Sequence, residues 1–549
     1  MAKQPHRSRN DQPPAVRDPF DSVETLASMA RVINPTRLAR QALEFQRELW
    51  SISVGDSERD PDPRDWRFQD PAWTHNPSAR RLVQTYLAWA DALAGTVDED
   101  ADDWRDVQRA KFGIELLTAA AAPTNQLFSN PAALKEMIDT GGESVLRGFR
   151  NWADDLLRNG GMPGQVDRTR FEVGKDLAVT PGAVVFRSDL LELIQYQPST
   201  ATVRARPTLL VPPQINKYYF LDLAPGRSLT EYAVSRGIPF FTISWRNPGP
   251  EHADWTLDTY IEAALEAIDA VCEITGSDDL LTLGICAGGI TTTAMLAYQT
   301  TVGDHRVAAT SFSVMQIDWE EPTMMGMFAH PTMGPLAKSI SERRGILPGE
   351  NLAQVFSWLR PNELVWNYWV NNYLMGKKPP AFDVLFWNAD STNLPAGLHG
   401  DFIDLFNDNL LAKGAFSVLG KPIDLRTIEL DHFVSAGIND HITPWRGGYR
   451  TTQLLGGQSE FVLSQAGHIA SVVNPPGNPK AHYYAGPDPG PDPDAWLRGA
   501  ERRAGTWWER WADWTCERSG DEVPAPQELG SSRYPVLDEA PGRYVLEPA

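Results

Sequence analysis

The sequence predicts an α/β fold, in which a mainly parallel sheet is covered by helices on both faces and follows a helical region. Short apolar runs alternate with helical stretches from about residue 171 onward, and such alternation is typical of βαβ units. Before that point, apolar residues recur at the spacing of amphipathic helices. The alternation stops between about residues 318 and 409, which are rich in Met, Trp and Pro. We interpret this stretch as an insertion that forms a cap subdomain over the end of the sheet.

The length of the chain and the spacing of its apolar residues divide it into three parts. With 549 residues, of which 42% are hydrophobic, the chain is long enough for two domains. Residues 1–60 are predicted to be partly disordered, with a candidate amphipathic helix around Leu38–Leu49. Residues 61–175 are expected to form a helical N-terminal domain, and residues 176–549 a catalytic domain that carries the cap.

The expected strands and helices of the catalytic domain follow one another in order. Two neighbouring apolar runs predict a strand pair, and later runs predict short buried strands. The strands are expected at Ala183–Phe186, Leu191–Tyr196, Thr208–Val211, Phe240–Ile243, Leu280–Leu283, Val307–Ser313, His432–Gly437 and Ser459–Leu463, and helices at Leu257–Ile274 and around Trp507–Trp514. The tryptophan-rich helix near the C-terminus is expected to dock on the core rather than on a membrane.

Composition excludes several classes of protein. Lys plus Arg is 50 and Asp plus Glu is 71, so the net charge is 50 − 71 = −21, which would repel a nucleic acid. Three cysteines are too few for a disulfide framework and indicate a reducing cytoplasm. The N-terminus lacks the apolar region of a secretory signal, and no stretch approaches the roughly 20 apolar residues of a membrane helix. We therefore expect a soluble cytoplasmic protein with no transmembrane segment.

The strongest functional signal lies in the stretch that ends at Gly289. An apolar run leads into Gly284-x-Cys286-x-Gly288-Gly289, and a helix-like stretch follows. Strand, sharp turn and helix are the setting of a nucleophile elbow, in which small neighbours permit strained backbone angles at the central residue. We predict that Cys286 is a nucleophile and that the amide of Ala287 supplies half of an oxyanion hole. The alternative is a buried cysteine that only packs.

Two later strands end in polar residues that complete a catalytic triad. Asp440 follows one strand and His468 follows the next, and reactive loops of open α/β sheets gather at the carboxyl ends of strands. The order nucleophile, acid, histidine is that of α/β-hydrolases. We therefore predict an α/β-hydrolase fold in which His468 takes the proton of Cys286 and Asp440 fixes the imidazole tautomer. His441 is the alternative histidine. Asp390, which follows a strand-like run at Phe386–Trp387, is the alternative acid.

The second oxyanion donor is expected in the loop after Thr208–Val211. Pro212 and Pro213 have no amide hydrogen, so the first available amides are those of Gln214 and Ile215. Lys217 and Arg246 are candidates for contacts with substrate phosphates, although surface charge is the favoured interpretation of both residues. No metal site is expected.

A thiol nucleophile narrows the chemistry. Attack of a thiolate on a thioester exchanges one thioester for another, so the acyl group on Cys286 stays reactive toward a hydroxyl. Such a site favours acyl transfer or ester polymerisation over simple hydrolysis.

Several motifs together resemble those of the polyhydroxyalkanoate synthases, over the chain from about Arg67 to the C-terminus. They include the Cys286 box and four further runs: Val211-Pro212-Pro213-Gln214-Ile215-Asn216-Lys217-Tyr218-Tyr219, Ser244-Trp245-Arg246-Asn247-Pro248, Asn439-Asp440-His441-Ile442-Thr443-Pro444-Trp445, and Gly467-His468-Ile469 with Asn474-Pro475-Pro476-Gly477-Asn478-Pro479-Lys480. The resemblance is to the single-subunit type and to the medium-chain-length class (class II). Ala287 and Ala470 depart from that class, and Ala470 resembles the short-chain class (class I).

The resemblance implies an activity and its partners. Cys286, activated by His468, would take an (R)-3-hydroxyacyl group from coenzyme A, and a 3-hydroxyl would then attack the acyl-enzyme, with Asp440 supporting His468 or the hydroxyl. Coenzyme A is part of the substrate, and no cofactor is implied. The family also implies a homodimer at cytoplasmic polyhydroxyalkanoate granules, in contact with the growing polyester.

Two other functions remain open at this stage. A thioesterase or acyltransferase of the same fold would transfer the acyl group to water or a small alcohol, giving free acid rather than polymer. A granule-binding protein without activity would have an inert Cys286.

Overall fold

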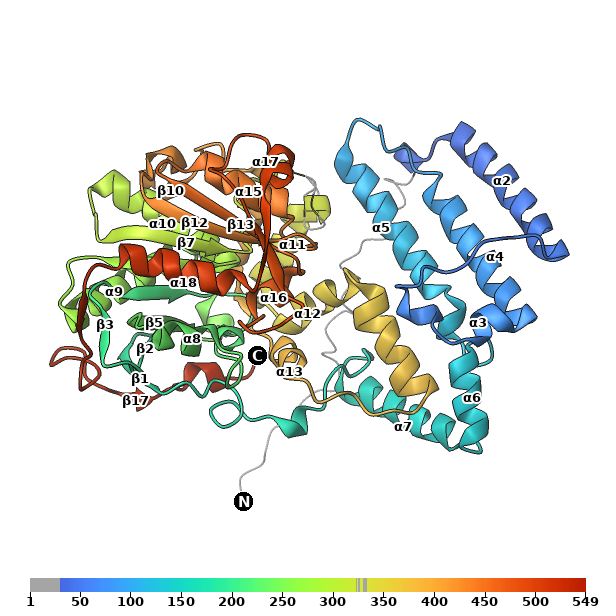
Figure 1. The fold of residues 1–549 in the computed structure, drawn as a ribbon, viewed down its shortest axis with the longest axis horizontal. Coiled ribbons are helices and arrows are strands. Elements are labelled where there is room, and N and C mark those ends of the chain that lie inside the picture. Colours follow the sequence, from blue (N-terminus) through green and yellow to red (C-terminus); the bar gives the residue numbers. More distant parts are fainter. Residues whose placement is uncertain (1–29, 322, 324–325, 329–332) are drawn as a thin grey trace, which may run out of the picture. The chain divides into compact units, whose positions relative to one another are not determined.

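The computed structural model describes residues 30–321, 323, 326–328 and 333–549, and the chain divides into two compact units (Figure 1). The helical unit comprises Met1–Pro163 and Ser357–Lys377, and the sheet unit comprises Gly164–Phe356 and Lys378–Ala549. Partial disorder was predicted for residues 1–60, and residues 1–29 of this segment lie outside the described residues. The sequence interpretation placed Ser357–Lys377 in the cap, whereas this segment clusters with the N-terminal helices.

Asparagine–proline pairs start three helices of the helical unit. Asn34, Asn76 and Asn130 each accept hydrogen bonds from backbone amides of the first turn, and a proline follows each of them. This is the preferred chemistry of a helix start, because the asparagine side chain satisfies amides that have no partner within the helix. The described helices are α2 (Pro35–Val54), α3 (Ala72–His75), α4 (Pro77–Ala94), α5 (Trp104–Ala120), α6 (Pro131–Asp139) and α7 (Glu143–Arg158). The helix predicted around Leu38–Leu49 is confirmed as α2.

The segment Ser357–Lys377 packs closely on α7. It contains two π-helical turns, η7 (Asn362–Trp366) and η8 (Trp369–Leu374). A Cβ atom at Gly148 of α7 would lie 1.8 Å from the carbonyl oxygen of Tyr373, so only glycine permits this approach. The Tyr373 hydroxyl also donates to Asp155 of α7 at 2.8 Å. These contacts join residues far apart in sequence, and neither periodicity nor composition indicates them.

The sheet unit contains an 11-stranded sheet in the order β15-β14-β13-β12-β7-β6-β4-β5-β2-β1-β17. The six strands from β13 to β5 are parallel, and the strands at both edges pair antiparallel. The strands are β1 (Gly182–Arg187), β2 (Leu191–Tyr196), β4 (Thr208–Val211), β5 (Phe240–Trp245), β6 (Leu280–Ile285), β7 (Val307–Ser313), β12 (Asp431–Gly437), β13 (Ser459–Ser464), β14 (His482–Ala485), β15 (Glu501–Ala504) and β17 (Asp538–Glu539). All eight predicted strands are confirmed, and β14, β15 and β17 were not predicted.

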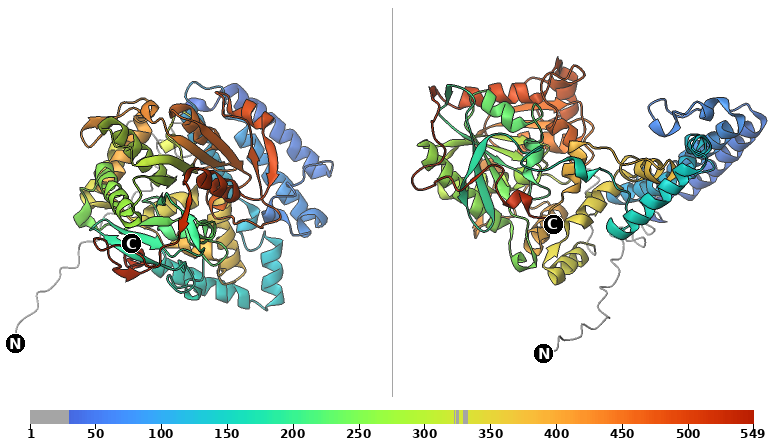
Figure 2. Two further views of the ribbon diagram at one scale, coloured as in Figure 1. Left: turned by 60° about the vertical axis from the view of Figure 1, so that its left-hand side comes forward. Right: turned by 90° about the horizontal axis from the view of Figure 1, so that it is seen from below.

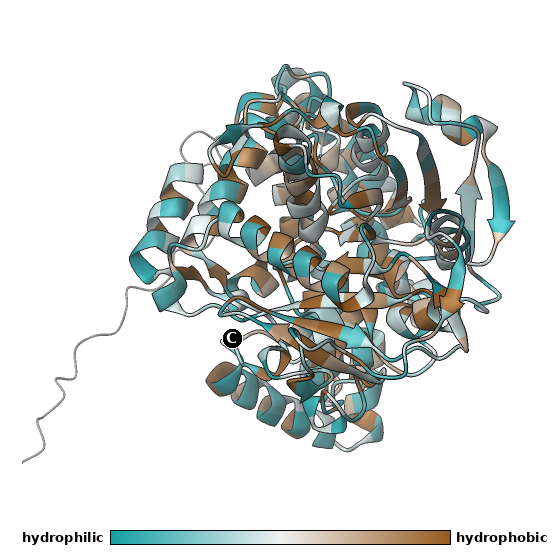
Figure 3. Ribbon diagram, turned by 90° about the vertical axis from the view of Figure 1, so that its left-hand side faces the viewer, coloured by the Kyte–Doolittle hydropathy of each residue, from teal (hydrophilic) through white to brown (hydrophobic). Residues whose placement is uncertain are grey.

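Both faces of this sheet are buried under helices (Figures 1 and 2). Leu209 and Val211 of β4 lie in one apolar cluster and Leu210 lies in the other, because successive side chains of a strand point to opposite faces. The hydropathy colours show apolar strands at the middle of the unit (Figure 3). Helices α9 (Leu257–Thr275) and α10 (Ala287–Val302) contribute to the first cluster, and α8 (Leu229–Ser235) and α18 (Trp507–Arg518) to the second.

Helix α18 docks on the sheet as predicted. Trp507, Trp508, Trp511 and Trp514 are all buried in the second cluster. The indole nitrogens of Trp507 and Trp508 donate to carbonyl oxygens of residues 471 and 472. Within the described part of the chain, no helix has the length and apolarity needed to cross a membrane.

The part of the insertion that remains in the sheet unit is mainly helical. The helices are α11 (Met333–Arg344), most of α12 (Gly349–Trp358), α13 (Asp383–Ala389) and α14 (Ala396–Asp408), and the short strands β8 (Ile346–Leu347) and β9 (Leu394–Pro395) pair with each other. A second short pair, β10 (Ser417–Val418) with β11 (Lys421–Pro422), follows the insertion. The strand-like interpretation of Phe386–Trp387 is wrong, because both residues lie in α13. A short aromatic run has no periodicity that separates strand from helix.

Candidate active site

Cys286 lies at the sharp turn between β6 and α10, in a backbone conformation with φ 50° and ψ −123°. A residue other than glycine adopts such angles only when the surrounding structure holds it there. The amide of Cys286 donates to the carbonyl oxygen of Ser313 at 3.0 Å, which ties the turn to β7. This is the geometry of a nucleophile elbow.

The glycines around Cys286 are required by close approach. A Cβ atom at Gly288 would lie 2.2 Å from the carbonyl oxygen of Val211, and one at Gly289 would lie 2.5 Å from Cγ of Met315. A Cβ atom at Gly284 would lie 2.7 Å from Cα of Gly289. The helix that follows Cys286 can therefore start directly against the end of β4.

His468 and Asp440 meet at the carboxyl ends of β12 and β13. His468 is the first residue of α16 (His468–Val472), and its Nδ1 lies 2.7 Å from Oδ2 of Asp440. Both residues are buried. Since these two strands are adjacent and parallel, the loops that follow them reach the same edge of the sheet.

Thr443 helps to fix the carboxylate of Asp440. Oδ1 of Asp440 accepts hydrogen bonds from the amides of Ile442 and Thr443, both at 2.9 Å, and the Thr443 hydroxyl lies 2.8 Å from Oδ2. Burial raises the pKa of Asp440, but the His468 ring and Thr443 outweigh this and lower it. Thr443 was not among the predicted residues. The signal was present, because an aspartate that accepts amides two and three residues later forms a common turn.

The imidazole of His468 binds Asp440 and feels the charge of Cys286. Burial lowers the pKa of His468, but the charge of Asp440, followed by that of Cys286, raises it to about 10. The ring is therefore favoured as an imidazolium beside the sulfur. The structure thus pairs the predicted base with the predicted acid, and the charge of the predicted nucleophile acts on the same ring.

The alternative acid, Asp390, is bound to other residues. Asp390 forms an ion pair with Lys217, with Oδ1 and Nζ 2.8 Å apart, and accepts the hydroxyl of Tyr219 at 2.9 Å. Asp440 directs its Oδ2 at Nδ1 of His468. The structure therefore places Asp440, and not Asp390, beside the imidazole.

The loop after β4 lies against the start of α10. Gly288 packs on Val211 and on Pro212, and Nε2 of Gln214 donates to the Thr291 hydroxyl of α10 at 2.9 Å. Among the described residues, no hydrogen bond uses the backbone N–H of Ala287, Gln214 or Ile215. These three amides are available to a ligand.

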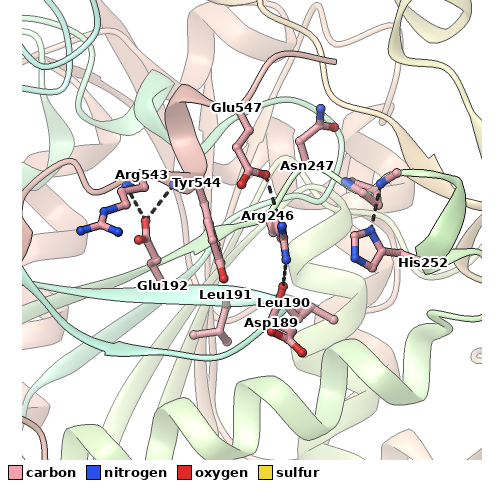
Figure 4. A network of polar contacts seen from close by, with 12 residues as sticks. Asp189, Leu190, Leu191, Glu192, Arg246, Asn247, His252, Arg543, Tyr544 and Glu547 are labelled. Atoms are coloured by element: carbon pink, nitrogen blue, oxygen red, sulfur yellow. Dashed lines mark hydrogen bonds and ion pairs between the residues drawn. The ribbon is translucent and has the colours of Figure 1, made fainter. Parts of the chain in front are cut away.

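Lys217 and Arg246 both have partners within the chain. Lys217 is buried beside Asp390, so the surface-charge interpretation of this residue is wrong. Nε of Arg246 lies 3.4 Å from Glu547, its Nη1 donates to the carbonyl oxygen of Asp189, and its guanidinium lies over the ring of Tyr544 (Figure 4).

The C-terminal segment is bound to the sheet near Arg246. The buried Glu192 of β2 accepts hydrogen bonds from the amides of Arg543 and Tyr544 at 2.9 and 3.0 Å (Figure 4). The Tyr544 hydroxyl donates to the carbonyl oxygen of Ser188 at 2.6 Å. This network is structural, and sequence reasoning missed it. Within the described residues, no group of three or more His, Cys, Asp or Glu side chains is arranged to hold a metal ion.

Comparison with known proteins identifies the family. A family model described as the N-terminus of poly-beta-hydroxybutyrate polymerase (PhaC) matches residues 64–233. Poly(3-hydroxyalkanoate) polymerase 1 of Ectopseudomonas oleovorans is 47% identical over 97% of this chain and 95% of its own length. The chain belongs to the poly(3-hydroxyalkanoate) polymerase family.

Other matches support the polymerase family and its fold. Poly(3-hydroxyalkanoate) polymerase 2 of the same organism is 47% identical over 96% of this chain and 94% of its own length. The poly(3-hydroxyalkanoate) polymerase subunit PhaC of Cupriavidus necator is 39% identical over 90% of this chain and 86% of its own length. A model of the alpha/beta hydrolase fold matches residues 215–475, a range that contains Cys286, Asp440 and His468. The predicted α/β-hydrolase fold is confirmed by this match together with the sheet order.

Proposed function

We propose that this protein polymerises (R)-3-hydroxyacyl groups from coenzyme A into a polyhydroxyalkanoate polyester and releases coenzyme A. The observation that carries the proposal is the pairing of His468 with Asp440 in a unit whose nucleophile elbow presents Cys286, the charge of which acts on the same imidazole. It occurs in a chain that is 47% identical, over nearly its full length, to a protein named as a poly(3-hydroxyalkanoate) polymerase.

The first step loads the acyl group onto Cys286. His468 holds the thiol proton, and the thiolate attacks the carbonyl carbon of the coenzyme A thioester. The amide of Ala287 and that of Gln214 or Ile215 donate to the oxyanion of the tetrahedral intermediate. When the intermediate collapses, the bond to the coenzyme A sulfur breaks and His468 protonates the leaving thiolate. One thioester replaces another, so the acyl group keeps its activation.

The second step forms the ester. The 3-hydroxyl of another monomer or chain end gives its proton to His468, and its oxygen attacks the acyl-cysteine carbonyl. The carbon–sulfur bond breaks, and the Cys286 thiolate leaves beside the imidazolium. Asp440 keeps the ring in the tautomer that presents the other ring nitrogen to the reacting groups and stabilises the imidazolium. Side chains and backbone amides of this chain supply every group, so the proposal calls for no metal and no prosthetic group.

The proposal extends to location and assembly. The product is an apolar polyester that separates from water, so the enzyme is placed at the surface of cytoplasmic polymer granules, in contact with the growing chain. Assembly as a homodimer follows from the resemblance to the synthases.

The test is incubation of the pure protein with (R)-3-hydroxybutyryl-CoA and (R)-3-hydroxyoctanoyl-CoA, beside Cys286→Ala. Release of coenzyme A together with precipitable polyester, both absent in the variant, is the expected result. The rates with the two substrates show which chain length the enzyme prefers. This matters because Ala470 departs from the pattern of the medium-chain class. Release with free acid as the only product would replace the polymerase with a thioesterase. No release from either substrate would contradict the proposal.

A further inference from the structure

The loop that carries the second oxyanion donor depends on a distant segment for its hydrogen bonds. We call residues 212–219 the oxyanion loop and Trp387–Thr392 the bridging segment. The backbone of the oxyanion loop forms no ladder with a strand, so its polar groups need other partners. Trp245 donates to the carbonyl oxygen of Pro212 at 2.8 Å, and the bridging segment supplies the contacts that follow.

The hydroxyl of Thr392 binds the oxyanion loop at two points. It donates to the carbonyl oxygen of Gln214 at 3.1 Å and accepts a hydrogen bond from the amide of Asn216 at 2.8 Å. Asn216 has φ 67°, a left-handed conformation that a non-glycine residue adopts only when it is held in place. Thr392 is buried, so water does not replace these bonds at low cost.

The bond to Gln214 sets the direction of the neighbouring amide. The carbonyl of Gln214 and the N–H of Ile215 belong to one peptide unit, which is planar and trans, so the two groups point in opposite directions. Once the oxygen is fixed toward Thr392, the N–H of Ile215 is fixed away from it. A hydrogen bond accepted by the oxygen also strengthens the N–H as a donor.

The bridging segment anchors the end of the loop as well. The indole of Trp387 donates to the carbonyl oxygen of Lys217 at 2.7 Å, and Asp390 binds both Nζ of Lys217 and the hydroxyl of Tyr219. Burial and the charge of Asp390 raise the pKa of Tyr219, so its hydroxyl keeps the proton that it donates. These contacts limit the movement of the oxyanion loop away from α10.

We infer that Thr392 is a positioning residue that aims the N–H of Ile215 at the oxyanion of the acyl-transfer intermediates. The inference rests on the proposed function and assigns the second oxyanion donor to Ile215 rather than Gln214. Thr392 acts through the Gln214–Ile215 peptide and does not touch the substrate. Its contribution appears only in steps that form an oxyanion.

The test compares Thr392→Val, which has nearly the same shape but no hydroxyl, with Thr392→Ser, which keeps the hydroxyl. Two rates are measured on each protein: the single-turnover release of coenzyme A from (R)-3-hydroxyoctanoyl-CoA, and the alkylation of Cys286 by iodoacetamide, followed by mass spectrometry. Alkylation displaces iodide from a saturated carbon and forms no oxyanion. It therefore reports the thiol and its triad alone.

In Thr392→Val we expect coenzyme A release to slow by about 10- to 100-fold, because a misplaced or missing oxyanion donor causes losses of this order in other enzymes. Alkylation of Cys286 should stay at the wild-type rate. Thr392→Ser is expected to restore release. Equal rates of release in wild type and Thr392→Val would overturn the inference, as would an equal loss of release and alkylation, which would indicate general damage to the site. If the wild type itself released no coenzyme A, the proposed function would fail instead.

Discussion

Asp440 and Asp390 are two aspartates of the sheet unit whose carboxylates bind very different nitrogens. Asp440 lies 2.7 Å from the imidazole of His468, and Asp390 lies 2.8 Å from the ammonium of Lys217. An imidazole can take up and release a proton during a reaction, whereas an ammonium paired with a carboxylate is a fixed charge contact. The comparison teaches that the nitrogen that a carboxylate binds, rather than its residue type, decides the role we propose for it: support of catalysis for Asp440 and positioning for the partly buried Asp390.

The two sites also differ in how the chain builds them. Asp440 follows a strand of the parallel sheet, and the neighbouring parallel strand leads to His468, so topology alone brings the pair together. Asp390 follows α13 in the insertion, and its contact with Lys217 joins residues 173 positions apart in sequence (390 − 217). The first arrangement follows from the fold, and the second depends on how one inserted segment packs.

The largest expected difference between the two carboxylates is in catalysis. Asp440→Asn keeps the shape of the side chain but favours the wrong imidazole tautomer, and it should lower kcat by about 10³- to 10⁴-fold. Asp390→Asn should lower kcat by about tenfold or less, since it weakens only an anchor of the oxyanion loop. The measurement is coenzyme A release at saturating substrate, with circular dichroism as the control for folding. A larger loss in Asp390→Asn than in Asp440→Asn would reverse the two assignments.

The features that the sequence can predict belong to the parallel sheet rather than to the insertion. The parallel strands, the elbow at Cys286 and the order of Asp440 and His468 could be predicted, because local periodicity and the ends of parallel strands determine them. Glycine at positions 284, 288 and 289 could be explained by the strained backbone of a nucleophile elbow, whereas the close approaches at these glycines needed the structure.

The insertion could not be predicted in the same way. Its aromatic runs have no clear period, so the strand-like pattern of Phe386–Trp387 does not reveal that both residues lie in α13. The separation of Ser357–Lys377 from the rest of the insertion has no local signal. Thr392 illustrates the limit, because a lone threonine in a polar stretch has no pattern that would connect it with Gln214. Long-range side-chain contacts of this kind depend on tertiary packing.

The next largest effect expected at these two aspartates is the effect of the Asp390–Lys217 ion pair on the stability of the protein. Asp390→Ala leaves Lys217 with its ammonium buried and without its counter-ion, and it should lower the free energy of unfolding by about 2–3 kcal/mol. The double variant Lys217→Met, Asp390→Ala removes the charge as well and should recover most of that loss. The measurement is chemical denaturation followed by tryptophan fluorescence. A double variant as unstable as Asp390→Ala would show that the ion pair is not the source of the cost.

The smallest expected difference is in the titration of His468. Its pKa is raised to about 10, chiefly by the charge of Asp440 against the effect of burial. Because a raised histidine pKa means that the folded state holds the proton more tightly, this contribution to stability is complete below the unfolded value of about 6.5 and disappears as the pH rises through about 10. In Asp440→Asn the titration midpoint should fall by about one unit or more.

The titration can be followed by NMR of histidines labelled with ¹³C. Asp390→Asn is the matched control and should leave the midpoint of His468 unchanged. His399, whose pKa burial lowers to about 4, provides an internal reference that stays neutral over the same range. An unchanged midpoint in Asp440→Asn would contradict the charge pairing.

The most direct test of the central claim is to trap the acyl group on Cys286. Octanoyl-CoA has no 3-hydroxyl, so it can acylate the thiol but offers no nucleophile for chain extension. Intact-protein and peptide mass spectrometry should find one octanoyl group on the peptide that contains Cys286, no adduct in Cys286→Ala, and full acylation in Asp390→Asn. Acylation of another residue, or the same adduct in Cys286→Ala, would contradict the assignment of Cys286 as the residue that carries the acyl chain.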